Sequence, residues 1–140
     1  MKKVLIINGP NLNLLGIRQP EIYGNKTFEE YLIELKKEFI ETEIDYFQSN
    51  IEGEIINKIQ ESDKFFKGII INAGGYTHSS VSIADAIAAI SLPVIEVHIS
   101  NILAREEFRS KSLIAPNCVG CISGFGLTSY TLAMNYFNKN

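Results

Sequence analysis

Glu96 and His98 are the first residues of this sequence whose types and spacing suggest chemistry. They stand two positions apart in the run Val94-Ile95-Glu96-Val97-His98-Ile99, whose β-branched residues are typical of a strand. Side chains two apart on a strand share a face, so the carboxylate can hold the imidazole in one tautomer. The pair is therefore a candidate part of a functional site; a buried polar pair of purely structural role is the alternative.

Arg18 and Tyr23 lie between Gly16 and Gly24, in a long segment without clear strand or helix spacing. About nineteen residues separate the first apolar run from the first amphipathic segment, whereas such connections usually take about two to six. Long connections of this kind often act as lids, and the two glycines could serve as hinges. We therefore expect a lid over residues 16–25; a surface loop without function is the alternative.

Arg105, Arg109 and Asp85 are weaker candidates. On a short helix expected over residues 104–111, the two arginines are four apart and share a face, which suits binding of a carboxylate. The glutamates between them equally fit a solvated helix face. Asp85 lies on the flank of the apolar stripe of another expected helix, where by itself it would be a surface residue.

Cys118 and Cys121 match the C-x-x-C pattern, but the second cysteine lies inside an expected strand, whereas redox pairs normally precede a helix. We therefore expect no redox role. Neither the cysteine spacing nor the two histidines, expected at the ends of different strands, indicates a set of zinc ligands. The expectation is a protein without metal or organic cofactor.

Five short apolar runs predict the strands that must position these residues, at residues 4–7, 44–47, 69–71, 94–99 and 119–122. Segments with helical spacing follow them, at residues 28–39, 54–61, 81–90, 104–111 and 127–137. Thr27 and Glu30 form a capping-box pattern at the start of the first. The alternation predicts a single α/β domain over residues 1–140: a flavodoxin-like, doubly wound, five-stranded parallel sheet of order 2-1-3-4-5.

In such sheets, ligands bind beyond the carboxyl ends of the strands. Four of the expected strand ends carry loops rich in Asn, Gly and Ser, at residues 8–11, 72–78, 98–101 and 123–126, and these loops contain both histidines. Such residues also form ordinary turns. Four such loops at one edge of the sheet nevertheless favour a binding site.

Composition and charge exclude several classes of protein. With 46% hydrophobic residues, 21% charged residues and a net charge of -3, the chain is typical of a globular domain and lacks a basic nucleic-acid footprint. The apolar run after the N-terminal lysines is too short for a signal peptide, and no run approaches the length of a membrane span. We expect a cytoplasmic protein that binds neither nucleic acid nor membrane.

Five stretches that cover nearly the whole chain carry a family resemblance: NGPNLNLLGIRQPEIYG, QSNIEGEIINKIQ, IIINAGGYTHSSVSIADAI, PVIEVHISN and REEFRSKSLIAPNCVGCISGFGLTSY. In this order, they closely resemble type II 3-dehydroquinate dehydratase. The resemblance implies a flavodoxin-like fold and a dodecamer built as a tetramer of trimers. It also implies dehydration of 3-dehydroquinate to 3-dehydroshikimate, by anti elimination through an enolate, in the shikimate pathway of aromatic amino acid biosynthesis.

The resemblance also implies a role for each site residue. Tyr23 would be the base, supported by Arg18, and His98, oriented by Glu96, would donate a proton. Asn11 would hold a water near the enolate oxygen. The residues that would bind substrate are Asn72, His78, Ile99, Ser100 and Arg109, with Asp85 reaching in from a neighbouring subunit.

These roles match what the reaction requires: a base, a stabiliser of negative oxygen and an acid for the leaving group. For Tyr23 to act near neutral pH, its pKa must fall from about 10 by roughly two to three, which needs about 3 to 4 kcal/mol of differential stabilisation. Arg18, helped by Arg109 or Arg105 under a closed lid, could supply it. No lysine falls in the expected site, which argues against a Schiff base.

The alternative function is a flavodoxin-like binding or signalling domain without catalytic activity. A flavin carrier would need a Ser/Thr-rich phosphate loop after the first strand, where the chain has NGPNLNLLG. A phosphorylation receiver would need an aspartate at the end of the third strand, where the chain has Asn72, and acidic residues after the first. The sequence therefore favours the enzyme.

Overall fold

Five parallel strands form one sheet in the order β2-β1-β3-β4-β5. The computed structural model describes residues 2–139, apart from the side chains of Lys2, Ile22 and Tyr23. The strands are β1 (Lys2–Asn8), β2 (Thr42–Gln48), β3 (Gly68–Asn72), β4 (Val94–His98) and β5 (Gly120–Ser123). The predicted strands and their order are confirmed, with ends that differ by one or two residues.

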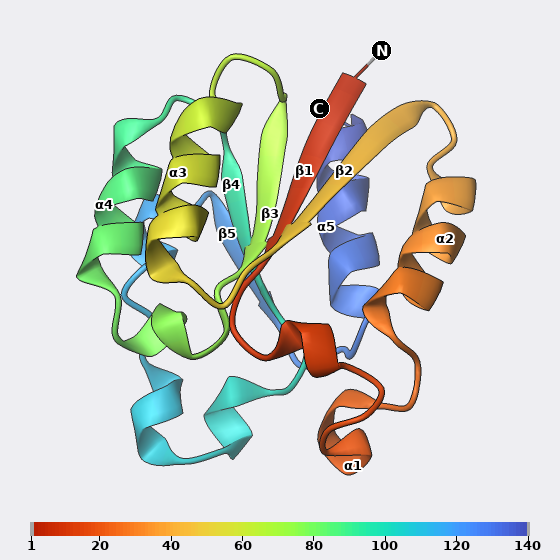
Figure 1. Ribbon diagram of the computed structural model, residues 1–140, viewed down its shortest axis with the longest axis vertical. Coiled ribbons are helices and arrows are strands. Elements are labelled where there is room, and N and C mark those ends of the chain that lie inside the picture. The colour runs from red at the N-terminus through yellow and green to blue at the C-terminus, as the bar shows by residue number, and fades with distance from the viewer. Residues whose placement is uncertain (1, 140) are drawn as a thin grey trace.

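Helices cover both faces of this sheet (Figure 1). α3 (Glu52–Ser62) and α4 (Val81–Ala89) lie on one face, and α2 (Phe28–Glu38) and α5 (Thr128–Lys139) lie on the other. The short elements are α1 (Pro20–Tyr23) and the 3-10 helices η1 (Leu12–Leu14), η2 (Gly74–His78), η3 (Ile102–Ala104), η4 (Glu107–Ser110) and η5 (Ala115–Asn117). None of the helices in the described part of the chain is long and apolar enough to cross a membrane.

The central strands are buried on both faces, which explains their nearly continuous apolar sequences. Along β1, Val4 and Ile6 join the core under α2 and α5, whereas Leu5 and Ile7 join the core under α3 and α4. This division follows from the alternation of side chains along a strand. The sheet is thus held rigidly from both sides, with its carboxyl edge left for loops.

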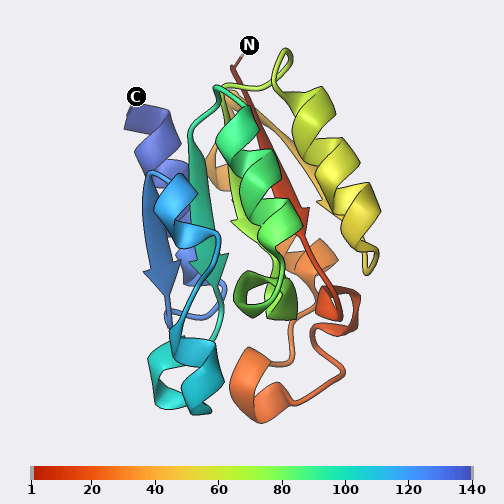
Figure 2. The same ribbon diagram turned by 90° about the vertical axis from the view of Figure 1, so that its left-hand side faces the viewer.

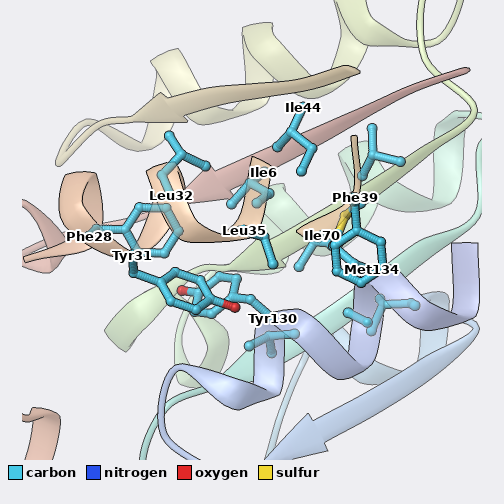
Figure 3. Close-up of a cluster of buried hydrophobic side chains, with 14 of the residues drawn as sticks. Ile6, Phe28, Tyr31, Leu32, Leu35, Phe39, Ile44, Ile70, Tyr130 and Met134 are labelled. Atoms are coloured by element: carbon cyan, nitrogen blue, oxygen red, sulfur yellow. The ribbon is translucent and has the colours of Figure 1, made fainter. Parts of the chain in front are cut away.

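The start of α2 has the predicted capping box. Thr27 Oγ1 accepts from the Glu30 amide at 3.2 Å, and Glu30 Oε1 accepts from the Thr27 amide at 3.0 Å. The apolar face of the helix packs against α5, with the rings of Phe28 and Tyr130 5.0 Å apart (Figure 3). The helix therefore anchors the far end of the long segment that follows β1.

The predicted helix over residues 104–111 does not form. η3 ends at Ala104 and η4 begins at Glu107, and between them Arg105 is extended, with φ −106° and ψ −159°. A short helix needs an apolar face to pack, and η4 buries no residue. The prediction that Arg105 and Arg109 share a helical face is therefore wrong.

The segment between β1 and α2 folds into a closed loop. Gly16 and Gly24 have φ values of 90° and 85°, which favour glycine. A Cβ on Gly16 would lie 2.9 Å from the carbonyl oxygen of Asn25, so the two ends of residues 16–25 lie side by side. α1 lies in this loop, beyond the carboxyl edge of the sheet (Figure 1). That residues 16–25 act as a lid remains a prediction.

Candidate active site

A cavity of about 130 Å³ opens at the carboxyl ends of β1, β3 and β4. In Figure 2, residues 16–25 and the segment that contains η3 and η4 both lie beyond this edge, below the ends of the strands. The residues that line the cavity are Pro10, Asn11, Leu12, Arg18, Asn72, Gly74, Gly75, His78, His98, Ile99, Ser100, Ile102, Arg105 and Arg109.

Most of the predicted site residues are in this lining. The exceptions are Glu96, Asp85 and Tyr23. Glu96 is fully buried behind His98, as expected for an orienting residue. Asp85 is exposed on α4 and is not among the lining residues. The side chain of Tyr23 lies outside the described part of the structure.

Glu96 holds His98 in place through a hydrogen bond between Oε2 and Nε2. Two hydroxyls hold the carboxylate in turn: Thr77 Oγ1 donates to Oε2 at 2.9 Å, and Ser112 Oγ lies 2.9 Å from both oxygens. Burial acts to raise the pKa of Glu96, but the bond and charge of His98 together with the hydroxyls outweigh it, so the pKa is lowered. An ionised carboxylate only accepts, so Nε2 of His98 carries a hydrogen and Nδ1 is the nitrogen that can exchange a proton with a ligand.

His78 forms the adjacent part of the wall. Its Nδ1 lies 2.8 Å from the carbonyl oxygen of Lys111, which can only accept, so Nδ1 carries the hydrogen. The neutral ring then presents Nε2 as an acceptor. The rings of His78 and His98 are nearly parallel, with centroids 6.4 Å apart. In their neutral forms, the two histidines thus each present one accepting nitrogen to the same cavity, Nδ1 of His98 and Nε2 of His78.

Asn72 belongs to a buried network at the base of the cavity. Its Nδ2 donates to the Tyr130 hydroxyl at 3.0 Å, and that hydroxyl donates to Asn8 Oδ1 at 2.7 Å. Asn72 Oδ1 accepts from the Gly74 amide at 3.1 Å. Burial raises the pKa of Tyr130, which therefore stays protonated as a donor. The network ties the ends of β1 and β3 to α5.

The loops after β1 and β3 pack backbone against backbone. A Cβ on Gly9 would lie 2.6 Å from the Ala73 carbonyl oxygen, so only glycine allows this approach. Asn11 follows in the left-handed region at φ 71°, which asparagine tolerates better than most residues. Its amide donates to Asn50 Oδ1 at 3.0 Å. These contacts fix the backbone that presents Asn11 to the cavity.

Three arginines, Arg18, Arg105 and Arg109, give the cavity a positive character, and none of its described lining residues is acidic. Arg109 Nε lies 3.1 Å from Glu106 Oε1, and Arg105 Nη1 donates to Ser100 Oγ at 3.4 Å. Because guanidinium groups pair with carboxylates in a forked geometry, this wall suits an anionic ligand. A ligand carboxylate could take the place of the exposed Glu106 beside Arg109.

Sequence reasoning missed several residues of the site. Ser112 and Thr77 had no sequence signal that linked them to Glu96, because the contacts depend on folding. Asn8 and Tyr130 likewise meet only in the folded chain. Arg105 was paired with Arg109 and named as a helper of Arg18, but it was not among the residues predicted to bind substrate, although it lines the same cavity as Arg109.

The cysteines are poor nucleophiles in this structure. Burial, followed by the charge of Glu96, raises the pKa of Cys118 to about 12 and that of Cys121 to about 11. Cys121 does, however, bring its sulfur close to the site: the donor atoms of Glu96, His98 and Cys121 lie within 4.8 Å of one another, near enough to share a metal ion. This group was not anticipated from the spacing of the sequence.

Comparison with known proteins agrees with this architecture. The family model described as "Dehydroquinase class II" matches residues 2–138. A 3-dehydroquinate dehydratase of Caldicellulosiruptor saccharolyticus is 57% identical over 137 residues, covering 96% of this chain and 94% of the relative. The type II dehydroquinase of Butyrivibrio crossotus is 49% identical, with a TM-score of 0.92 over 98% of this chain and 97% of that one. The enzyme of Propionibacterium acnes is 36% identical, with a TM-score of 0.96 over 100% and 98%. The chain therefore belongs to the class II dehydroquinase family.

Proposed function

We propose that this chain dehydrates 3-dehydroquinate to 3-dehydroshikimate, the reaction of the shikimate pathway for which its relatives are named. The observation that carries the proposal is the meeting of a carboxylate-held histidine and three arginines in one cavity. A histidine that can donate a proton, next to arginines that can bind a carboxylate and stabilise negative oxygen, suits elimination of water from an anionic hydroxy-ketone. Membership of the class II dehydroquinase family supports the same substrate.

The reaction proceeds by anti elimination through an enolate. Tyr23, on the lid, takes a proton from the carbon next to the ketone, and Arg18 stabilises the tyrosinate and the developing negative charge. A water held by Asn11 donates to the enolate oxygen. When the enolate collapses, the carbon–oxygen bond to the β-hydroxyl breaks, and Nδ1–H of protonated His98 supplies the proton that lets it leave as water.

Binding of the substrate is divided between two walls of the cavity. Arg109, the Ser100 hydroxyl and the backbone of Ile99 hold the substrate carboxylate, while Asn72 and His78 contact its hydroxyl groups. Residues 16–25 close over the substrate and exclude water, which strengthens every charge interaction inside.

A neighbouring subunit completes the site in this proposal. Asp85 is exposed on α4 of its own chain and is available to an adjacent subunit. We therefore propose a homo-oligomer, a dodecamer arranged as a tetramer of trimers. The expected cytoplasmic location remains a prediction.

The test is the absorbance of the conjugated enone that forms when purified protein meets 3-dehydroquinate. We expect product to appear at an undiminished rate after treatment with a chelator, and also in the presence of borohydride, because the proposed steps use neither a metal nor an imine. His98→Asn should remove most of the rate in a folded protein. A folded wild-type protein that forms no enone would instead favour a binding or signalling domain.

A further inference from the structure

We propose that Glu96, His98 and Cys121 form an inhibitory binding site for a thiophilic divalent cation such as Zn²⁺. β4 and β5 are paired so that Glu96 stands opposite Cys121, and His98 lies two positions further along β4. Side chains opposite one another in a parallel pair, and those two apart on one strand, point to the same face of the sheet. The register of two strands therefore gathers three kinds of ligand at one place.

The three donor atoms are a carboxylate oxygen, an imidazole nitrogen and a sulfur, all common zinc ligands. Zinc holds such atoms at about 2.0 to 2.3 Å, which places neighbouring ligands roughly 3.3 to 3.8 Å apart in a tetrahedron. In this structure the atoms lie within 4.8 Å of one another. For the ion to bind, the side chains of His98 and Glu96 must move apart and the Cys121 sulfur must move closer to them. These are movements of side chains alone.

Hydroxyl groups already support the carboxylate from the far side. Thr77 and Ser112 donate to Glu96 and hold its orientation. Partners of this kind in the outer shell of a metal site fix the ligand and raise metal affinity. Glu96 is therefore already oriented as an anion and has no contact with bulk water before the ion binds.

The ion can reach the site without crossing the arginine-lined cavity. Cys121 is an exposed residue and β5 is the last strand of the sheet, so the ion can approach Cys121 from this edge. On binding, the Cys121 thiol loses its proton to solvent, and neutral His98 binds through Nε2 with its hydrogen on Nδ1. Three protein ligands leave a fourth position for water.

Cys118 provides a matched comparison within the same chain. Its sulfur donates to the carbonyl oxygen of Ile114 at 3.4 Å, and the residue packs against the core under α3 and α4. Cys118 is not among the three clustered donors. Replacing either cysteine by serine removes one thiol from the protein, but only Cys121→Ser removes a ligand.

Binding of the ion is expected to stop catalysis, a consequence that rests on the proposed role of His98 as proton donor. The metal occupies Nε2, so the doubly protonated ring that acts as proton donor cannot form. The Nδ1–H that remains on the neutral, metal-bound ring is a much weaker acid than an imidazolium. Glu96, now a metal ligand, no longer directs the hydrogen of Nε2. The site thus makes the enzyme sensitive to free zinc without using zinc in the reaction.

Binding is measured first, independently of activity, by titrating the intact protein with Zn²⁺ in a calorimeter and with Co²⁺ in a spectrophotometer. Wild type and Cys118→Ser should each bind one Zn²⁺ per chain with similar affinity, and Cys121→Ser should bind at least about tenfold more weakly. With Co²⁺, the thiolate-to-metal charge-transfer band should appear in wild type and Cys118→Ser and be absent from Cys121→Ser. Equal affinity and an equal band in both variants would overturn the site.

Activity then tests the inhibition. Zn²⁺ should inhibit wild type and Cys118→Ser, a chelator should restore both, and Cys121→Ser should need at least about tenfold more Zn²⁺ for the same inhibition. Binding through Cys121 without any inhibition would overturn the claim that the ion takes His98. A protein without dehydratase activity before zinc is added would refute the proposed function instead, while the calorimetric and cobalt measurements would still decide the metal site.

Discussion

Replacement of Glu96 by glutamine tests whether His98 acts through its buried carboxylate. Glu96 is fully buried and accepts hydrogen bonds from His98, Thr77 and Ser112. Glutamine has nearly the same size but carries no charge, and its amide has one accepting atom where the carboxylate has two. The substitution therefore weakens the bond that directs His98 while it leaves the packing of β4 nearly unchanged.

The magnitude follows from the kind of bond that is lost. A hydrogen bond to a charged group contributes about 1.5 to 3 kcal/mol. If this bond stabilises the transition state in which His98 transfers its proton, its loss lowers kcat by about 10- to 150-fold. KM should change by less than about threefold, because Glu96 does not line the cavity and the loss concerns the transition state rather than binding.

Steady-state kinetics of the enone product would measure both constants. Glu54→Gln is the matched control. Glu54 also accepts a hydrogen bond from a buried serine, Ser49, but Glu54 lies on α3 and does not line the cavity. It should keep wild-type kinetics. If folded Glu96→Gln kept more than about half of wild-type kcat, or lost activity only through KM, then Glu96 would not act through proton transfer by His98.

Tyr23→Phe should lower kcat by at least about a thousandfold and change KM by less than about tenfold, since it removes the proposed base but little binding surface. Retention of a tenth of kcat would move the search for the base to His78 or Asp85. Arg109→Ala should raise KM by at least about tenfold, because the charge-assisted bond to the substrate carboxylate is lost; an unchanged KM would argue against that contact. Light scattering should report an assembly larger than a trimer, and a fully active monomer would contradict a shared role for Asp85. The lowered pKa of Glu96 means that its stabilising contribution is complete above the ordinary glutamate pKa and is lost as pH falls through the folded-state value. Thermal unfolding should therefore show a larger loss of stability on acidification for wild type than for Glu96→Gln, and equal losses would contradict this.

The candidate site was predictable where its parts depend on local patterns. Glu96 and His98 share a face because they are two apart on a strand, and the structure joins them as expected. Arg105 and Arg109 line one cavity although their helix does not form, since the loop brings both to the same wall. The spacing predicted that the two arginines lie close together, but the predicted reason, a shared helix over residues 104–111, was wrong. That helix does not form because the segment has no buried apolar face to stabilise it.

Local sequence patterns were enough to predict the strands, most of the helices and the edge of the sheet at which a site would form. The β-branched runs, helical spacing and capping residues act between neighbours in the chain, and the order of a doubly wound sheet follows from their alternation. The contacts between distant groups became known only from the folded chain: Ser112 with Glu96, Tyr130 with Asn8 and Asn72, and Cys121 opposite Glu96. The contact of Cys121 with Glu96 depends on the register between β4 and β5, and the other two depend on how a loop and α5 pack on the sheet. Both register and packing are set by the whole core rather than by any local pattern.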